Sequence, residues 1–421
     1  MGIKCLIRFQ SFAVADTDLN YKHMGRVKNL MMEMDEHGYA WFPHGEKCVC
    51  SNHFGDRYLN QYILERGDKG VCSYCGRRDT VIDMSDLANH IGMTISVYFN
   101  DVDSECLPLA SSYYDEEDEY IPGIRRVGCF AVPENADLYE DTSEMMDDLG
   151  LHTDCEELNE DIDNFFGNYV WIKKDPFELW WNEKKEREWK NFAEKVKHSR
   201  RFTFLAERGD DGNILDELVT ALRNFDSLVR MLPIDTTLFR ARSVGKIIKA
   251  ALGFEELTSA PDNSAGQCRM SPLGVSMFYA AFDKDTAVEE CVKGAGGKLL
   301  VVGEFKTTRE LSLVDLTALP NHVSIWMDRW ESVAFLKSFH RSITQPLLEN
   351  GKEGIEYVPS QIFTEYLRWM FRDKNGKKVD GLIYDSCKTS KSNVVLFCNN
   401  TESASWVRLG NSYVESNSIN N

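Results

Sequence analysis

The chain has 421 residues with 67 acidic and 48 basic side chains, so its formal net charge at pH 7 is −19. Residues 101–165 contain 21 acidic and two basic side chains, which account for the whole excess. Nucleic-acid binding needs a basic surface that displaces counterions from phosphates, and no domain here has a basic excess, so a nucleic-acid partner is not expected. Hydrophobic residues make up 43% of the chain, which is enough for packed cores and excludes a wholly disordered protein.

The N-terminal segment, residues 1–46, is predicted to be helical because apolar residues recur in it at spacings of three to five. Its first residues mix apolar with charged side chains and lack a small-residue cleavage site, so no signal peptide is predicted. No apolar run approaches the roughly 20 residues that span a bilayer. We therefore expect a soluble, cytoplasmic protein without membrane contact, with most of its twelve cysteines reduced.

Residues 47–100 contain two pairs of metal-binding residue types, Cys50-Ser-Asn-His53 and Cys72-Ser-Tyr-Cys75. A gap of two residues lets a tight turn direct both ligand atoms of a pair at one tetrahedral Zn²⁺. The predicted ligands are therefore Cys50, His53, Cys72 and Cys75, with Cys48 as an alternative to His53; ordinary buried thiols are the competing explanation. A closed set of four ligands leaves no open position for water, so the zinc is expected to be structural.

The next two segments are expected to be mainly helical. Residues 101–165 form an acidic segment in which short helices with a solvated face are predicted. In residues 166–210, Asp175 is a good helix cap and Pro176 suits the first helical position, so a helix is predicted from there to about Val196.

Residues 211–405 have a different pattern, in which short predicted strands alternate with helices and glycine turns. We therefore expect an α+β chain, with a mainly α N-terminal half and a C-terminal domain built around a sheet. Residues 406–421 are expected to be a frayed tail, because Ser and Asn dominate beyond Asn411.

Four stretches of this C-terminal domain place polar side chains at the ends of short predicted strands. They are Leu238 to Arg242, Gly266 to Pro272, Phe278 to Glu290, and Asp380 to Ser386. Each has an ordinary structural explanation when taken alone. Arg240 could be a surface strand residue, Glu290 part of an exposed helix face, and Ser386 a turn residue, so no single stretch predicts a function.

Together the stretches resemble the RES domain family, which is named for its Arg, Glu and Ser. The matching segments occur in the family's order: Phe239-Arg240, Arg269-Met270-Ser271-Pro272, Tyr279, Thr286-Ala287-Val288-Glu289-Glu290, Tyr357-Val358-Pro359-Ser360-Gln361, Asp380 to Ser386, and Asn393-Val394-Val395-Leu396-Phe397. One position departs from the family pattern, because Ser271 stands where an Asn is usual. The resemblance implies a fold with the split β-sheet of ADP-ribosyltransferases and NAD⁺ as the substrate.

The resemblance also implies which residues would act. The catalytic set would be Arg240, Tyr279, Glu290 and Ser386, and the substrate-binding set Arg269, Arg242 and Asn393. A Glu carboxylate can stabilise the oxocarbenium-like state formed when the nicotinamide–ribose bond breaks. Arg side chains can bind the pyrophosphate in a bidentate manner, Tyr279 can stack on a ring of NAD⁺, and Ser386 can bind a phosphate or ribose oxygen. No Gly-x-Gly-x-x-Gly turn follows a predicted strand, which argues against a Rossmann dehydrogenase.

The N-terminal half resembles the HEPN-like domain that is fused to RES domains. The resemblance is carried by the two metal-binding pairs and by the helix that ends His198-Ser-Arg-Arg-Phe-Thr-Phe. The family usually has Cys-x-x-Cys where this chain has Cys50-x-x-His53. Nuclease members carry an Arg and a His with four to six residues between them, and none of the nine histidines here has an Arg at that spacing. The resemblance therefore implies the fold without the nuclease.

These inferences lead to one main hypothesis and two alternatives. The main hypothesis is an NAD⁺-degrading toxin or antiphage defence effector, which is a glycohydrolase if water is the acceptor and a phosphorylase if phosphate is. The first alternative is a mono-ADP-ribosyltransferase that modifies a protein, and the second is a non-catalytic nucleotide-sensing module. By resemblance to free RES toxins, the partners to expect are an antitoxin or regulatory protein, and self-association is also open.

Overall fold

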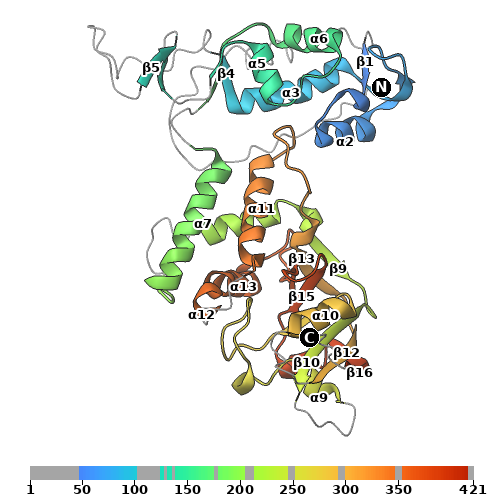
Figure 1. Cartoon of the computed structure of the whole chain (residues 1–421), viewed down its shortest axis with the longest axis vertical. Coiled ribbons are helices and arrows are strands. Elements are labelled where there is room, and N and C mark those ends of the chain that lie inside the picture. The colour runs from blue at the N-terminus through green and yellow to red at the C-terminus, as the bar shows by residue number, and fades with distance from the viewer. Residues whose placement is uncertain are drawn as a thin grey trace, which may run out of the picture. The chain divides into compact units, whose positions relative to one another are not determined.

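The computed structural model in Figure 1 describes residues 47–101, 124–127, 130–134, 138–174, 179–203, 213–244, 252–292, 299–346 and 353–415. The chain divides into two compact units, Met1–Glu178 with Ser324–Trp326 and Leu179–Val323 with Met327–Asn421. The helix predicted within residues 1–46 and the helix start predicted at Asp175 lie outside the described residues. Within the described ranges, no helix is long and apolar enough to cross a membrane.

The described part of the N-terminal unit contains small antiparallel sheets and short helices. The strands are β1 (Cys48–Cys50), β2 (Asp68–Val71) and β3 (Arg78–Asp83) in the order β1-β3-β2, β4 (Phe99–Asp101), β7 (Leu138–Tyr139) and β8 (Trp171–Lys173) in the order β4-β8-β7, and the pair β5 (Ile124–Val127) and β6 (Phe130–Pro133). The helices are α2 (Arg57–Arg66), α3 (Met84–Tyr98), α5 (Thr142–Asp148) and α6 (Glu156–Phe166), with a 3₁₀ turn η1 (Ser51–His53).

The capping residues and the spacing of apolar residues explain why these segments form helices. Asp83 caps α3, because its side chain accepts a 2.9 Å hydrogen bond from the backbone N–H of Ser85. Leu87, Ile91 and Ile95 then recur every four residues and are fully buried. The acidic helix α6 follows the same rule: Leu158, Ile162, Phe165 and Phe166 are buried while most of its carboxylates lie on the other face. Short helices with a solvated acidic face were predicted for this segment.

The C-terminal unit is built on one mixed sheet. Its strands, in spatial order, are β16 (Val407–Glu415), β12 (Leu299–Thr307), β10 (Thr237–Val244), β11 (Phe278–Ala281), β15 (Ser392–Leu396), β14 (Gly381–Asp385), β13 (Leu311–Asp315) and β9 (Val229–Leu232). Only the β13–β14 pair is parallel. The combination of this sheet with separate helices confirms the α+β prediction.

The sheet is split between β10 and β11. Strand β10 pairs with β12 along its whole length, from Thr237↔Lys306 to Val244↔Leu299. Its pairing with β11 consists of the single register Phe239↔Ala281. The two parts of the sheet therefore diverge beyond this point, as in the predicted split sheet. Helix α10 (Lys284–Val292) follows β11 directly and packs against β10, β11 and β12.

One face of the sheet carries a helical layer. It consists of α7 (Trp181–His198), α8 (Asn213–Arg223), α11 (Trp330–Thr344) and α13 (Val358–Met370), and Figure 1 shows α7 and α11 side by side. Strand alternation places Leu382 and Tyr384 in the core beneath these helices and Ile383 in the core of the opposite face. The sheet is thus buried on both faces, which makes it a rigid support for side chains at its split.

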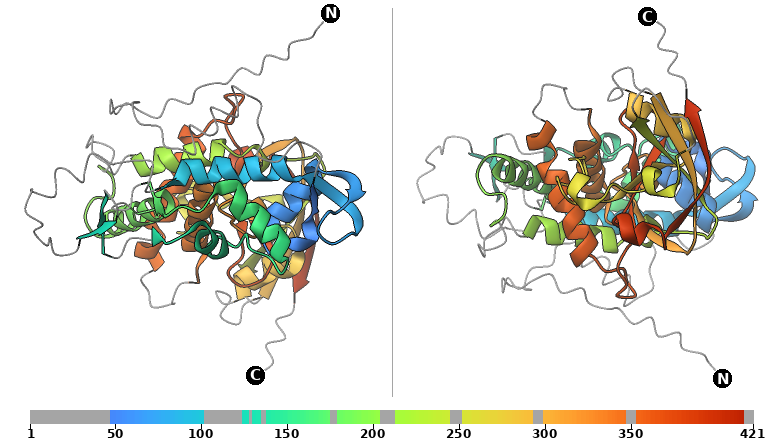
Figure 2. Two further views of the ribbon diagram at one scale, coloured as in Figure 1. Left: turned by 90° about the horizontal axis from the view of Figure 1, so that it is seen from above. Right: turned by 90° about the horizontal axis from the view of Figure 1, so that it is seen from below.

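One predicted segment has a different structure, and another makes a contact that the sequence did not indicate. Residues 406–421 were predicted to be a frayed tail, but Val407–Glu415 form β16, which pairs with β12 at the edge of the sheet and is drawn in red in Figure 2. The strand was not predicted because Ser and Asn, which are uncommon in strands, dominate the tail. Its backbone groups pair with those of β12. Residues 166–210, predicted as the helical end of the N-terminal domain, contain α7, in which Trp189 and Phe192 pack in the core of the C-terminal unit.

Candidate active site and metal centre

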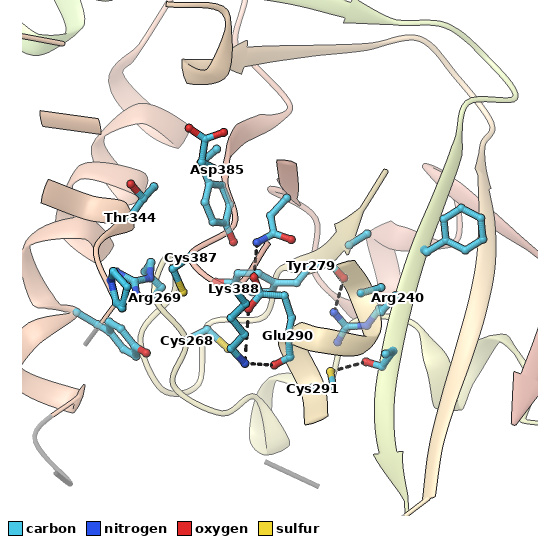
Figure 3. Close-up of a pocket in the computed structure, with 18 of the residues that line it drawn as sticks. Arg240, Cys268, Arg269, Tyr279, Glu290, Cys291, Thr344, Asp385, Cys387 and Lys388 are labelled. Carbon is cyan, nitrogen blue, oxygen red and sulfur yellow. Dashed lines mark hydrogen bonds and ion pairs between the residues drawn. The ribbon is translucent and has the colours of Figure 1, made fainter. Parts of the chain in front are cut away.

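A cavity of about 510 Å³ lies where the sheet of the C-terminal unit splits. Its walls come from β10, β11, α10 and the loops around Arg269 and Lys388, as Figure 3 shows. Of the seven residues predicted to act on NAD⁺, the structure places five on its lining: Arg240, Arg269, Tyr279, Glu290 and Asn393. Residues that are distant in the sequence thus meet at one cavity.

Glu290 on α10 is held by two donors at one of its oxygens. Oε1 accepts a 2.6 Å hydrogen bond from Oγ of Ser386 and a 2.7 Å bond from Nδ2 of Asn393, and both donor residues are buried. The Oγ of Ser386 also accepts from the backbone N–H groups of Lys388 (3.1 Å) and Thr389 (3.2 Å). Because that oxygen already accepts from two N–H groups, its own proton is directed at Glu290. Ser386 therefore contacts the carboxylate of Glu290 directly.

Arg240 joins the two parts of the split sheet. Its Nε donates to the carbonyl oxygen of Leu257 at 3.0 Å and its Nη1 to that of Tyr279 at 2.7 Å. Burial lowers the pKa of the Arg240 guanidinium below its usual value. A guanidinium has five N–H donors, so three remain after these two bonds, and the side chain lines the cavity.

Arg269 lies on the opposite side of Glu290 from Arg240 in Figure 3. Its Nη1 and Nη2 donate to the carbonyl oxygens of Ile343 and Gln345, both at 2.9 Å, at the C-terminal end of α11. The turn that carries it is held by α13, because Nε2 of Gln361 donates to the Cys268 carbonyl at 2.8 Å and Oγ of Ser360 to the Arg269 carbonyl at 2.6 Å. The Tyr-x-Pro-x-Gln motif therefore positions Arg269.

Tyr279 contacts the residue that departs from the family pattern. Its hydroxyl lies 2.8 Å from Oγ of Ser271, which is buried. Burial raises the pKa of Tyr279 well above its ordinary value, and burial together with the charge of Glu290 raises that of Tyr384, which also lines the cavity. Both phenols therefore stay neutral over the physiological pH range.

Arg242 is the predicted substrate-binding residue that the structure does not place on the cavity lining. Its Nη1 donates to the backbone carbonyl of Glu256 instead. Alternation does put Arg242 on the same face of β10 as Arg240, but two residues along a strand move the side chain by about 6.6 Å. Lys388 is the converse case: it lines the cavity, and the motifs used to recognise the site do not mark its position.

The role of Arg240 in joining the strands gives a stability prediction. Arg240→Lys is expected to lower the free energy of unfolding by about 1–3 kcal/mol, because lysine lacks the planar fork whose separate Nε and Nη1 atoms reach these two carbonyls, so one buried acceptor is left without a donor. Urea denaturation followed by tryptophan fluorescence measures this change. Arg408→Lys is the control, since Arg408 is exposed and pairs with the exposed Asp235; an equal loss in both variants would contradict the structural role of Arg240.

The N-terminal unit brings the four predicted zinc ligands together. The ligand atoms of Cys50, His53, Cys72 and Cys75 all lie within 4.8 Å of one another. The Sγ atoms of Cys50 and Cys75 are 3.7 Å apart, and Sγ of Cys72 is 3.3 Å from Nε2 of His53. Such distances suit ligand atoms arranged tetrahedrally around one Zn²⁺ at about 2.0–2.3 Å. Cys48, the alternative ligand, is not in this group.

The electrostatics of Cys72 also suit a metal ligand. Burial raises its thiol pKa, but the backbone N–H groups of Cys75, Cys50 and Tyr74 and the side chain of His53 outweigh this effect and lower the pKa to about 6. A thiol with that pKa is mostly a thiolate at neutral pH, which is the form that binds zinc.

Comparisons with known proteins agree with these two parts of the chain. Residues 65–210 match the model of the HEPN/RES N-terminal domain 1, and residues 237–413 match that of the RES domain. The chain is therefore a RES-domain protein with a HEPN/RES N-terminal domain, which confirms the family resemblance. The first of these matches includes α7, which packs in the C-terminal unit.

Two further comparisons do not contribute to the family assignment. A solved structure, the MbcT–MbcA toxin–antitoxin complex of M. tuberculosis, contains a chain that is 14% identical, with 48% of this chain and 93% of that chain covered and a TM-score of 0.27. A search of the curated proteins finds no match. The family assignment therefore rests on the two domain models.

Proposed function

We propose that this protein is an NAD⁺-degrading enzyme, acting as a toxin or defence effector, that breaks the bond between nicotinamide and ribose. The observation that carries the proposal is the Glu290 carboxylate on the lining of the cavity, with Oε1 held by Ser386 and Asn393. Its other oxygen, Oε2, makes no hydrogen bond within the described part of the chain. It is therefore available to accept a ribose hydroxyl and to face a developing positive charge.

The chemistry follows from that placement. When the glycosidic bond breaks, its electron pair goes to the pyridinium nitrogen, nicotinamide leaves as a neutral molecule, and the positive charge moves to the ribose. A fixed carboxylate stabilises this oxocarbenium-like state more than the ground state, which lowers the barrier. The acceptor then bonds to the ribose carbon: water gives ADP-ribose with release of a proton, and phosphate gives the ADP-ribose phosphate ester.

The remaining cavity residues suit the rest of NAD⁺. Arg240 and Arg269 have donors left after their carbonyl bonds, and a guanidinium matches the oxygens of a pyrophosphate. The neutral ring of Tyr279 offers an aromatic surface to nicotinamide or adenine. A cavity of about 510 Å³ lies in the range of small-molecule sites.

The test is to incubate the purified full chain with NAD⁺, with and without inorganic phosphate, and to identify the products by mass spectrometry. We expect free nicotinamide with ADP-ribose, or with ADP-ribose phosphate when phosphate is present. Adenine label found on protein would favour the mono-ADP-ribosyltransferase. Tight NAD⁺ binding without turnover would contradict the enzyme and favour the nucleotide-sensing module.

We further propose that Cys50, His53, Cys72 and Cys75 hold one structural Zn²⁺ in the N-terminal unit. The support is the approach of all four ligand atoms to within 4.8 Å and the low pKa of Cys72. Four protein ligands complete a tetrahedron, so the ion would crosslink β1, η1 and the turn after β2 and would not bind a reactive water.

A further inference from the structure

A lysine outside the recognised motifs lies against the Glu290 carboxylate. Lys388 belongs to the same loop as Ser386, and its Nζ is 3.9 Å from Oε2 of Glu290. The same Nζ donates to the backbone carbonyl oxygens of Glu289 at 3.1 Å and of Glu290 at 2.9 Å. An ammonium group has three donors, so two of them fix Lys388 to the C-terminal end of α10 and one remains. Figure 3 shows Lys388 beside Glu290.

This arrangement gives the two oxygens of Glu290 different surroundings. Oε1 is held by two hydrogen bonds, whereas Oε2 faces an ammonium group at a distance too long for a hydrogen bond. At 3.9 Å the opposite charges attract each other without occupying the lone pairs of Oε2. The side chain of Lys388 is only 24% exposed, so solvent screens this attraction less than it would on an open surface.

The backbone of Lys388 acts in the same direction. Its N–H donates to Oγ of Ser386 at 3.1 Å, which orients the hydroxyl that donates to Glu290. Lys388 therefore influences the carboxylate twice, through its own charge and through Ser386. A side-chain substitution removes the first contribution and leaves the second in place.

We propose that Lys388 is a positioning residue for Glu290, whose ammonium group holds the carboxylate with Oε2 turned to the substrate. The inference rests on the proposed cleavage of NAD⁺. Two donors of Lys388 bind carbonyl oxygens of α10, and its charge acts on Glu290. Removing the ammonium group is therefore expected to slow the cleavage step more than it weakens the binding of NAD⁺.

The test compares Lys388→Met with a matched lysine in the same loop by measuring nicotinamide release against NAD⁺ concentration. For Lys388→Met we expect kcat to fall about 10- to 100-fold, the loss that a misplaced reacting group causes, with KM changed by less than about threefold. Lys391→Met is the control, because Lys391 pairs with Asp283 at the start of α10, 3.0 Å away, and does not line the cavity. Its kcat should equal that of the wild type.

Each other outcome overturns a defined part of the proposal. A raised KM with unchanged kcat would make Lys388 a substrate ligand, and unchanged kinetics would remove its role. Lys388→Gln keeps a donor for the carbonyls but no charge, so full activity in this variant would overturn the role of the charge; it also replaces Lys388→Met if that protein does not fold. A wild type without NAD⁺ turnover would instead overturn the proposed function.

Discussion

Replacing Glu290 with Gln is expected to slow NAD⁺ cleavage by about 100- to 1000-fold, the range that one preorganised electrostatic group contributes to catalysis. The carboxylate charge is lost, so the positive charge that develops on the ribose has no counterpart. The amide keeps the shape of the side chain, and its carbonyl oxygen can still accept from Ser386 and Asn393. Nicotinamide release at saturating NAD⁺ measures the change.

The neighbouring Glu289→Gln variant is the control for this experiment. Glu289→Gln is the same substitution on the same helix, but the side chain of Glu289 is exposed and does not line the cavity. Successive helical residues point about 100° apart, which explains the difference. Wild-type turnover by Glu290→Gln, or an equal loss in Glu289→Gln, would remove Glu290 as the group that stabilises the transition state.

The two glutamates also show what the sequence could predict. The Thr-Ala-x-x-Glu pattern distinguishes Glu290 from Glu289, and the structure agrees by placing Glu290 alone of the two on the cavity lining. The order of the other motifs likewise predicted that Arg240, Arg269, Tyr279 and Asn393 would meet. These residues could be predicted because their motifs, taken together, resemble those of the family.

Contacts that depend on tertiary structure could not be predicted in the same way. Alternation along a strand predicts the face on which Arg242 lies, but it does not say how far the cavity extends along that strand. Lys388 reaches α10 through a loop whose path no local pattern specifies. The family pattern marks Ser386 but does not name its partner within the protein, which is the carboxylate of Glu290.

The pairing of strand β16 and the packing of helix α7 could not be predicted, because both depend on partners that are distant in the sequence. Strand β16 contains Gly410, Asn411 and Ser412, which favour turns, yet its backbone groups pair with β12. Helix α7 has an apolar stripe that predicts a buried face but not the partner of that face. Trp189 packs edge to face on Phe339 of α11, 4.8 Å between ring centroids, and this contact assigns the helix to the C-terminal unit.

Replacing Cys72 with Ser is expected to abolish zinc binding and to destabilise the N-terminal unit by on the order of 4 kcal/mol or more, the range in which loss of a metal falls. Cys72 is almost fully buried, and its lowered thiol pKa favours the thiolate that binds the ion. A serine hydroxyl stays protonated and is a poor zinc ligand. Metal analysis of the purified protein should give about one zinc per wild-type chain and none for the variant.

Cys48→Ser is the matched control, because Cys48 precedes the first pair on the same strand but lies outside the group of four ligand atoms. It should keep its zinc, and chelation should then lower the melting temperature of this variant and of the wild type alike, since binding to the folded state alone contributes to stability. Loss of zinc in Cys48→Ser together with its retention in His53→Ala would show that Cys48 completes the tetrahedron. Wild-type protein that folds without any metal would contradict the structural zinc site.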